Sequence, residues 1–362
     1  MFGSGFRFRQ WIARVLRPGP GVRSAFARRS LVAVSLLVGG CAQSEDPQIV
    51  FDGPTMGTYY SVKVARPPQG MSAESLQPQV AKVLDAVVAE ISTYDPTSEL
   101  SRLNRNPSTD WIPISAELYR VVAEGQRISS LTDGAFDITI GPLVNLWGFG
   151  PETRPARLPS EQEIAAAKAR VGWRKLELRA DPPALRKARG DIYIDLSALG
   201  EGYGADRVGV WLESQGITDY MVAVAGAIRT RGNNAKGEPW AIAIEEPLPD
   251  RRSVHRIIPV SNRALSTSGD YRNFFEENGK RYSHEIDPMT GEPVDRRLGS
   301  VTVVDDSAMV ADGWATALMV LGDRRGPEAA KAQGLAAYFI VRDTNDQPRG
   351  FGSPAFESIM QR

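Results

Sequence analysis

Strand-like and helix-like segments interleave irregularly along this 362-residue chain. The clearest helix pattern runs from Glu74 to Ser92, where apolar residues recur every three or four positions and mark one buried face. The predicted helices span residues 74–92, 116–130, 161–171 and 200–216, with another from 311; the predicted strands span 51–64, 191–196, 221–224, 240–244, 257–260, 301–304 and 336–341. Because the steady βαβ rhythm of a Rossmann sheet is missing, this order predicts a single mixed α/β domain of the α+β class.

The formal net charge of zero conceals two different parts of the chain. The first 41 residues contain seven arginines and no acidic residue, which leaves 36 basic and 43 acidic side chains in the rest, a net charge of about −7. A protein that binds nucleic acid presents a basic face to it. The composition therefore argues against a nucleic-acid partner.

The only cysteine, Cys41, ends a segment that is typical of exported lipoproteins. Arg28 and Arg29 precede the apolar run 31–37, and Val38-Gly39-Gly40 lead into the cysteine. The apolar run is too short to span a bilayer as a mature helix. The pattern predicts lipidation of Cys41; a buried free cysteine at the end of a core helix is the alternative.

These features divide the chain into three predicted parts. Residues 1–41 are expected to be the signal peptide, residues 42–50 a short tether, and residues 51–362 the folded domain. We expect a protein anchored to a bacterial membrane by its lipid and facing the periplasm. Ala42, rather than an aspartate, follows the cysteine and hints at the outer membrane, and export through the general or the twin-arginine route stays open.

Residues 263–322 concentrate side chains that could do chemistry. Ser266–Asn273 is rich in hydroxyl groups and is interpreted as an anion-binding loop. His284 follows it and is a candidate general base, although a structural histidine is the simpler reading. Asp312 and Thr316 are four residues apart on a predicted helix and share one face, as two oxygen ligands of Mg²⁺ would. The alternative is an acid near a helix N-terminus beside a packed threonine.

A glycine-rich segment, Gly200–Gly204, follows a predicted strand and opens a predicted helix. A phosphate group could lie at that helix N-terminus. The glycines do not fit the pattern of a dinucleotide fingerprint. No nucleophile elbow, HExxH, Walker A or CxxC motif is present in the sequence.

Taken together, six short motifs in order resemble those of the ApbE family, the FAD:protein FMN transferases. They are Met56-Gly57-Thr58; Tyr94 with Ser98 to Asn104; Thr132 to Asp137; Asp195-Leu196-Ser197 with Gly202-Tyr203; Thr267 to Asn273; and Ser283-His284 with Ile286-Asp287-Pro288, followed by Ala311-Asp312 and Ala315-Thr316-Ala317. Each motif is weak alone, but the set runs in register across most of the chain.

The resemblance implies a flavin transferase domain that splits FAD, joins the FMN phosphate to a threonine or serine of a target protein and releases AMP. It implies Mg²⁺ held by Asp312, Thr316 and the backbone carbonyl of Ala198, with His284 and Asp312 as catalytic residues. The implied contacts to FAD are Met56, Tyr94, Ala135, Phe136, Asp137, Asp195, Glu201 and Ile286. The expected acceptor is a redox subunit facing the same compartment. The guanidinium of Arg272 is a further candidate to bind phosphate, on its chemistry alone.

Three positions depart from the family pattern. Glu201 stands where many relatives have lysine, Ala225-Gly226 replaces a double glycine, and Ala315 replaces an acid that some relatives place beside the metal. Two other functions stay open on the sequence alone. One is hydrolysis of FAD to FMN and AMP, with water in place of the acceptor. The other is a flavin-binding lipoprotein without turnover.

Overall fold

The computed structural model describes residues 48–152, 157–294, 297–345 and 347–361. All of these described residues belong to one compact unit, and the description below concerns that unit. Cys41 and the lipoprotein pattern lie outside the described residues. Within the described ranges, no helix combines the length and the apolarity needed to cross a membrane.

An eight-stranded sheet in the order β1-β2-β6-β7-β10-β15-β16-β17 forms the centre of the fold. Every neighbouring pair in it is antiparallel. Its strands are β1 (Gln48–Thr55), β2 (Thr58–Ala65), β6 (Tyr220–Val224), β7 (Ala227–Arg231), β10 (Ala264–Gly269), β15 (Leu298–Asp305), β16 (Ala336–Arg342) and β17 (Pro348–Gly352). Such a sheet cannot be a doubly wound Rossmann sheet, whose strands are parallel, so the predicted α+β class is confirmed.

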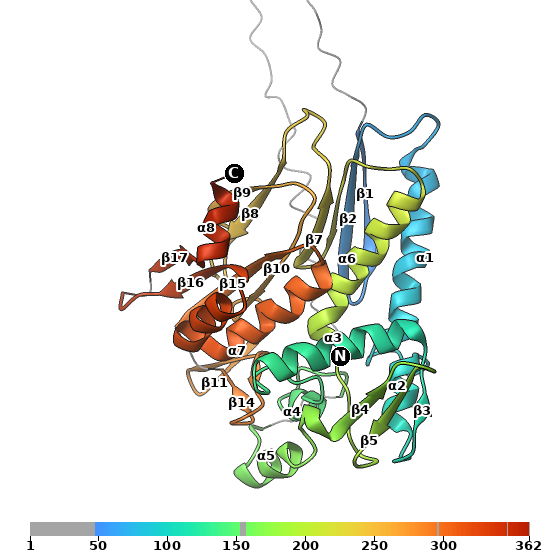
Figure 1. Cartoon of the computed structure of the whole chain (residues 1–362). Coiled ribbons are helices and arrows are strands. Elements are labelled where there is room, and N and C mark those ends of the chain that lie inside the picture. Colours follow the sequence, from blue (N-terminus) through green and yellow to red (C-terminus); the bar gives the residue numbers. More distant parts are fainter. Residues whose placement is uncertain (1–47, 153–156, 295–296, 346, 362) are drawn as a thin grey trace, which may run out of the picture. The chain divides into compact units, whose positions relative to one another are not determined.

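Three long helices cover one face of this sheet (Figure 1). They are α1 (Ala73–Ile91), α6 (Ser197–Ser214) and α7 (Ala308–Ala332). Buried residues of α1 and α6 pack on β1, β2 and β6, and those of α7 pack on β15 and β16. The periodic helix predicted over 74–92 is thus observed nearly at its predicted bounds, because a stripe repeating every 3.6 residues fits only a helix against a core.

The other face of the sheet is covered by the hairpin of β8 (Trp240–Glu245) and β9 (Val254–Val260) together with α8 (Pro354–Met360). Apolar side chains such as Trp240, Ile258 and Phe356 pack there against Val304 and Tyr338 of the sheet. Alternate residues of β15 therefore face two different cores, as the two-residue repeat of a strand requires.

Between α1 and α6 the chain forms a smaller group of elements. They are α2 (Glu99–Arg105), β3 (Ile112–Pro113), α3 (Ala116–Leu131), α4 (Gly141–Leu146), α5 (Glu161–Lys168), a 3₁₀ turn (Trp173–Lys175), β4 (Leu176–Arg179) and β5 (Ala184–Lys187). Two more hairpins follow β10, namely β11 (Phe274–Glu277) with β12 (Lys280–Ser283) and β13 (Ile286–Asp287) with β14 (Glu292–Pro293). Leu118, Val121 and Ile128 of α3 join the same core as α7.

The predicted strand over 51–64 is a hairpin rather than one strand. β1 and β2 are joined by a two-residue turn at Met56 and Gly57, with φ of +49° and +73°. Gly53 and Pro54, residue types that weaken strands, both pair with β2. β1 begins at Gln48, inside the segment 42–50 that the sequence analysis assigns to a tether.

The strand predicted over 191–196 is wrong. Residues 192–196 have no regular secondary structure, and they pair with no strand of the described chain. Asn104 holds Ile194 through both its backbone N–H and its carbonyl, each at 2.8 Å, and the N–H of Asp195 donates to the Ile138 carbonyl at 2.7 Å. Alternate residues of this segment are buried, which is the period of a strand, although the segment forms none.

Candidate functional site

A single glycine lets α6 and α7 approach each other backbone to backbone. A Cβ atom at Gly202 of α6 would lie 2.2 Å from the carbonyl oxygen of Ala308 in α7. The Gly202 N–H donates to Oδ2 of Asp312 at 3.1 Å. In a regular helix that N–H points at the carbonyl of Ala198, so the predicted ligands Asp312 and Ala198 approach the same N–H group.

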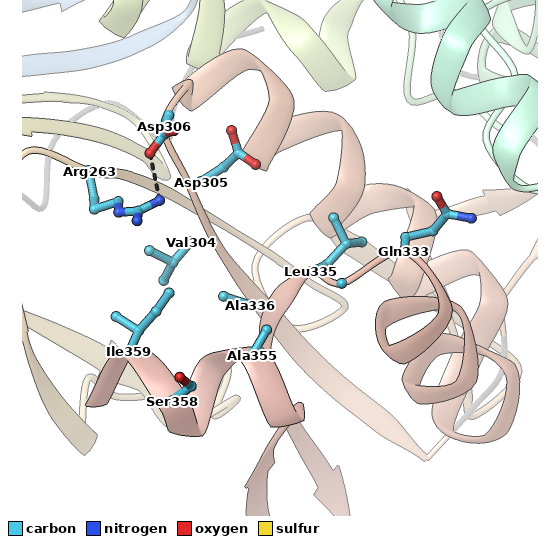
Figure 2. Close-up of a pocket in the computed structure, with 11 residues that line it drawn as sticks. Arg263, Val304, Asp305, Asp306, Gln333, Leu335, Ala336, Ala355, Ser358 and Ile359 are labelled. Carbon is cyan, nitrogen blue, oxygen red and sulfur yellow. Dashed lines mark hydrogen bonds and ion pairs between the residues drawn. The ribbon is translucent and has the colours of Figure 1, made fainter. Parts of the chain in front are cut away.

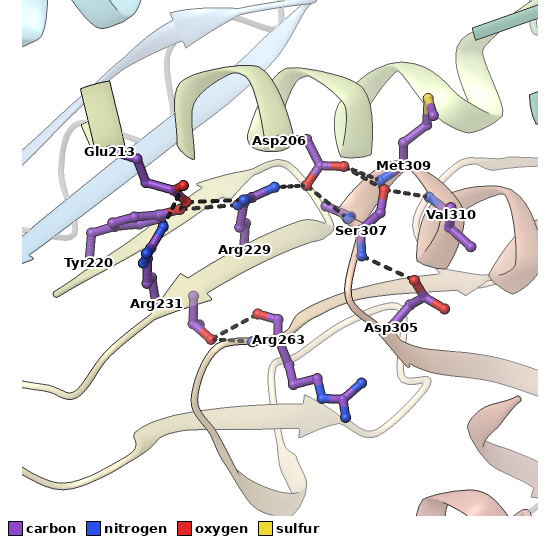
Figure 3. A network of polar contacts seen from close by, with 12 residues as sticks. Asp206, Glu213, Tyr220, Arg229, Arg231, Arg263, Asp305, Ser307, Met309 and Val310 are labelled. Atoms are coloured by element: carbon purple, nitrogen blue, oxygen red, sulfur yellow. Dashed lines mark hydrogen bonds and ion pairs between the residues drawn. The ribbon is translucent and has the colours of Figure 1, made fainter. Parts of the chain in front are cut away.

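Asp206, also on α6, fixes the start of α7. Its carboxylate accepts hydrogen bonds from the Ser307 hydroxyl at 2.6 Å and from the N–H groups of Ala308 and Met309 at 3.0 and 3.1 Å. Figure 3 shows Asp206 between this first turn and Arg229, whose guanidinium donates to Asp206 at 2.9 Å. Asp206 carries no signal of this role in the sequence, because an acid inside a helix reveals nothing about a partner a hundred residues away.

Asp312 and Thr316 face the sheet together, as their spacing predicts. Asp312 is only 7% exposed, and its Oδ1 accepts a hydrogen bond from the Ser266 hydroxyl at 2.8 Å. The hydroxyl oxygens of Thr316 and Ser268 are 3.1 Å apart. The segment that supplies both serines was predicted to be an anion-binding loop, and a loop is wrong for its first part, whereas anion binding there stays a prediction. Ala264–Gly269 is the strand β10 in the middle of the sheet, and its hydroxyl groups contact side chains of neighbouring elements.

Three carboxyl groups, Asp312, Glu201 and Glu285, have raised pKa values, and the charges of Glu201 and Glu285 both act on Asp312. Burial, and then the charge of Glu201, raise the pKa of Asp312 well above its ordinary value of 3.8. Burial also raises the pKa of Glu201, although the N–H of Gly226 and the charge of His284 oppose the shift. The pKa of Glu285 rises for the same reason, with Asp270 adding to it. Carboxylates in this arrangement are stabilised by a nearby cation.

His284 is held by one ring nitrogen only. Its Nδ1 lies 3.0 Å from the backbone carbonyl of Asn273, and since a carbonyl can only accept, Nδ1 carries the hydrogen. Nε2 of the neutral ring therefore has a lone pair that can take a proton. The nearly buried carboxylate of Glu285, a residue that the sequence analysis did not single out, lies 3.7 Å from Nε2. The ring of Phe149 contacts the imidazole edge-on, at 6.3 Å between centroids.

Four of the residues predicted to contact FAD lie on or near the surface around these groups. Tyr94 is 62% exposed and donates its hydroxyl to the carbonyl of Phe149 at 3.0 Å, next to the ring that contacts His284. Burial and then the charge of Asp195 raise the pKa of Tyr94. Asp195 itself accepts from the Ser197 N–H at 2.9 Å at the start of α6. Met56 lies in the β1–β2 turn and packs against α6. A Cβ atom added at Gly204 of α6 would lie 3.1 Å from the Met56 side chain. The fourth of these residues is Glu201, whose carboxylate accepts a hydrogen bond from the Gly226 N–H.

The other four predicted FAD contacts have side chains inside the protein. Ala135 and Phe136 belong to the main core and Ile286 to the cluster around Trp147. The carboxylate of Asp137 accepts hydrogen bonds from the N–H and hydroxyl of Thr139 and from the N–H of Trp173, at 2.6 to 2.9 Å. These side chains hold the surrounding loops in place, and their contact with FAD stays a prediction.

Arg272 has an ion-pair partner within the protein. Its guanidinium forms an ion pair with Glu245 at the end of β8, and it lies over the ring of Tyr271. The neighbouring Asp270 forms a two-bond ion pair with Arg342, at 2.6 and 2.7 Å. Glu245 lies 27 residues earlier in the chain, so this ion pair cannot be foreseen from the sequence around Arg272, whose contact with phosphate stays a prediction.

A hollow of about 340 Å³ lies away from all these groups (Figure 2). Asp305, Asp306 and Ile359 are among the residues that line it, and Arg263 and Asp306 form an ion pair at its wall, at 2.5 Å. None of the predicted site residues lines this hollow. His255 also lies apart from the site, with Nε2 3.1 Å from the Tyr338 hydroxyl.

Comparisons with known proteins agree on one family. The model of the ApbE family matches residues 56–339. The chain is 44% identical over 337 residues to the FAD:protein FMN transferase of Vibrio cholerae serotype O1, which covers 92% of this chain and 100% of the relative. It is 40% identical over 345 residues to the protein of that name from Escherichia coli K12, covering 93% and 98%.

Solved structures give the same result. The flavin transferase ApbE from Vibrio cholerae superposes with a TM-score of 0.80 at 44% identity, covering 86% of this chain and 99% of that one. The apo form of Pseudomonas stutzeri flavinyl transferase ApbE superposes with a TM-score of 0.79 at 39% identity, covering 88% and 98%. With its fold, its motifs and most of its length matched, this chain belongs to the ApbE family.

Proposed function

We propose that this protein transfers FMN from FAD to a threonine or serine hydroxyl of a target protein and releases AMP. Relatives that are 40% and 44% identical over nearly their whole length carry the name FAD:protein FMN transferase. On this chain, the observation that carries the chemistry is the fixed ring of His284, whose Nδ1 donates to a carbonyl and leaves Nε2 as the proton acceptor.

The proposed step exchanges one bond to phosphorus for another. The acceptor hydroxyl gives its proton to Nε2 of His284, its oxygen bonds to the phosphorus of the FMN half, and the bond from that phosphorus to the oxygen of AMP breaks. Phosphoryl transfer of this kind depends mainly on positioning and on charge neutralisation. The carboxylate of Glu285, 3.7 Å from Nε2, favours the positive charge that forms on the ring.

The residues present fit a magnesium ion. Asp312, Thr316 and the Ala198 carbonyl offer a carboxylate, a hydroxyl and a carbonyl oxygen, and Mg²⁺ prefers few protein oxygen ligands completed by water and phosphate. Burial of Asp312 and the nearby charges of Glu201 and Glu285 favour a cation at this place. In the described ranges, no three His, Cys, Asp or Glu side chains are grouped as a cage that could hold an ion by themselves. When bound, the ion would neutralise charge on the pyrophosphate.

A transfer assay tests the proposal. Purified protein, FAD and Mg²⁺ are mixed with acceptor domains that carry a threonine, and with the same domains carrying valine in its place. We expect covalent flavin on the threonine domains only, seen by mass spectrometry, with one AMP released per flavin attached. AMP release at the same rate without any acceptor would indicate hydrolysis instead. Tight FAD binding with no AMP in any mixture would indicate a flavin-binding protein without turnover.

We further propose that the protein works as a lipoprotein in the periplasm and modifies a redox subunit of a membrane complex there. The charged and apolar segments before Cys41 support this proposal. In the native host, the protein should fractionate with membranes, and Cys41→Ser should move it to the soluble periplasmic fraction without loss of transfer activity. Membrane association that survives Cys41→Ser would exclude the lipid anchor.

A further inference from the structure

We infer that Ser266 and Ser268 of β10 are positioning residues for the metal ligands Asp312 and Thr316. This inference rests on the proposed function, because it assumes that those two residues bind the ion. It assigns a role to the two serine hydroxyl groups of β10 that face α7.

The pairing follows from the spacing of the two elements. Residues two apart on a strand lie on the same face, about 6.8 Å apart, and residues four apart on a helix lie on the same face, about 6 Å apart along its axis. The near match lets two serines of β10 meet two ligands of α7 one to one. The Ser266 hydroxyl donates to Asp312 Oδ1 at 2.8 Å, and the hydroxyl oxygens of Ser268 and Thr316 are 3.1 Å apart.

Packing alone would not select serine on this face of the strand. Ser266 and Ser268 pair with Val303 and Val301 of β15, which are fully buried in the core against α7. Ser266 is itself only 1% exposed. A buried hydroxyl costs free energy unless it is hydrogen-bonded, so an aliphatic residue would be expected here if the strand only had to pack. The hydrogen bond to Asp312 accounts for the serine.

Each oxygen of Asp312 receives one hydrogen bond. Ser266 donates to Oδ1, and the N–H of Gly202 donates to Oδ2 at 3.1 Å. The two donors come from opposite sides, from the sheet and from α6, and so they fix the rotation of the carboxylate. Each oxygen retains further lone-pair capacity for an ion.

Thr316 needs a hydrogen-bond acceptor, whereas Asp312 needs donors. When a hydroxyl oxygen binds a cation, its lone pair faces the ion and its hydrogen points away. Oγ of Ser268, at 3.1 Å, can accept that hydrogen. The inference therefore assigns the direction of this hydrogen bond, with Thr316 as donor, and leaves the Ser268 hydrogen for another acceptor.

The test compares variants of these serines with a hydroxyl on the opposite face of the sheet. Ser266→Ala and Ser268→Ala should each weaken Mg²⁺ binding, roughly 10–100-fold as for other residues that orient metal ligands. Thr302→Val is the matched control, because its hydroxyl contacts Thr267 at 2.8 Å and faces the other core. Ser268→Thr, which keeps the hydroxyl, should retain wild-type Mg²⁺ affinity.

Two measurements on the full folded domain are needed. One is the rise in melting temperature on titration with MgCl₂ alone, and the other is the Mg²⁺ concentration that gives half-maximal AMP release. We expect both curves of the serine-to-alanine variants to shift to higher Mg²⁺, and those of Thr302→Val to stay in place. Ser266→Ala could lower the melting temperature so far that Mg²⁺ binding cannot be measured. Ser268 is partly exposed, so Ser268→Ala can still be measured in that case.

The outcomes separate the inference from the proposed function. If Mg²⁺ changes neither the melting temperature nor the activity of the wild type, the metal site itself is overturned. If the wild type responds to Mg²⁺ and both serine-to-alanine variants respond at the same concentrations, only the inference about Ser266 and Ser268 is overturned.

Discussion

At the scale of single residues, the hydrogen bond from His284 Nδ1 to the Asn273 carbonyl decides what the ring can do. His284→Ala should leave FAD binding nearly unchanged and slow transfer roughly 10²–10⁴-fold, because a general base acts only on the proton that moves in the transition state. Fluorescence titration measures FAD binding, and the appearance of covalent flavin measures transfer.

His255→Ala is the control for this change, since its ring pairs with Tyr338 on another part of the fold. It should transfer flavin at the wild-type rate. Transfer by His284→Ala at the wild-type rate would remove this histidine from the mechanism.

The sequence predicted roles for His284, Asp312 and Thr316 from their residue types, their spacing and the motifs that resemble the family, and the structure places Asp312 and Thr316 on one face of α7. It could not reveal Ser266 or Asp206, whose partners are 46 and about a hundred residues away. Arg272 shows the converse. Its charge suggested a phosphate contact, and only the folded chain brings Glu245 beside it.

At the scale of elements, the contact between α6 and α7 depends on Gly202. Gly202→Ala places a Cβ 2.2 Å from the Ala308 carbonyl, so the helices must separate. We expect a loss of about 1–3 kcal/mol in the free energy of unfolding, as for other overpacked sites, and weaker Mg²⁺ binding because the N–H bonded to Asp312 moves. Denaturant unfolding and titration with MgCl₂ measure the two effects.

Gly200→Ala is the matched control on the same helix. Its Cβ would meet only Ile91 Cδ1, at an ordinary 3.4 Å. Alanine is favoured over glycine inside a helix by about 0.5–1 kcal/mol, so this variant should be as stable as the wild type or slightly more. Equal losses at both positions would show that the close approach of α6 and α7 is not what Gly202 provides.

Periodic helices were predictable at this scale, whereas β10 and the segment 191–196 were not. A helical stripe over nineteen residues is specific for a helix packed on one side. The hydroxyl-rich strand β10 looked like a loop because its polar side chains face other parts of the fold. Residues 191–196 looked like a strand because apolar residues alternate there, and alternate residues are indeed buried although the segment pairs with no strand.

At the scale of the whole molecule, the buried carboxyl groups link stability to pH and to metal. A carboxyl group with a raised pKa favours folding below its ordinary pKa, 3.8 for Asp312 and 4.5 for Glu201 and Glu285, and that contribution is lost as pH rises through the raised value. Without metal, Asp312→Asn should therefore gain melting temperature relative to the wild type as pH rises from about 4 towards 8. The rise caused by MgCl₂ in the wild type should grow over the same range and be absent in the variant.

Glu163→Gln provides a control of opposite sign. Hydrogen bonds from Arg157 and Ser160 lower the pKa of Glu163 to about 2, so its contribution to stability is present above its ordinary pKa of 4.5 and is lost as pH falls. This variant should lose melting temperature relative to the wild type as pH rises from about 2 towards 5. If the difference in melting temperature between Asp312→Asn and the wild type does not change with pH, Asp312 is not a buried acid with a raised pKa.

The sequence by itself determined the class of fold, the periodic helices, the motifs of the family and the residue types available for binding an ion and taking a proton. These are local properties, set by side chains near one another in the chain. Only the tertiary structure decided which groups meet. The close contact of α6 with α7 brings the start of α6 to Asp312 of α7. The serine hydroxyl groups of β10 contact the two predicted ligands, Asp312 and Thr316. Such contacts join residues 46 to 110 positions apart, and the free energy that selects them comes from packing of the whole core, which no short stretch of sequence contains.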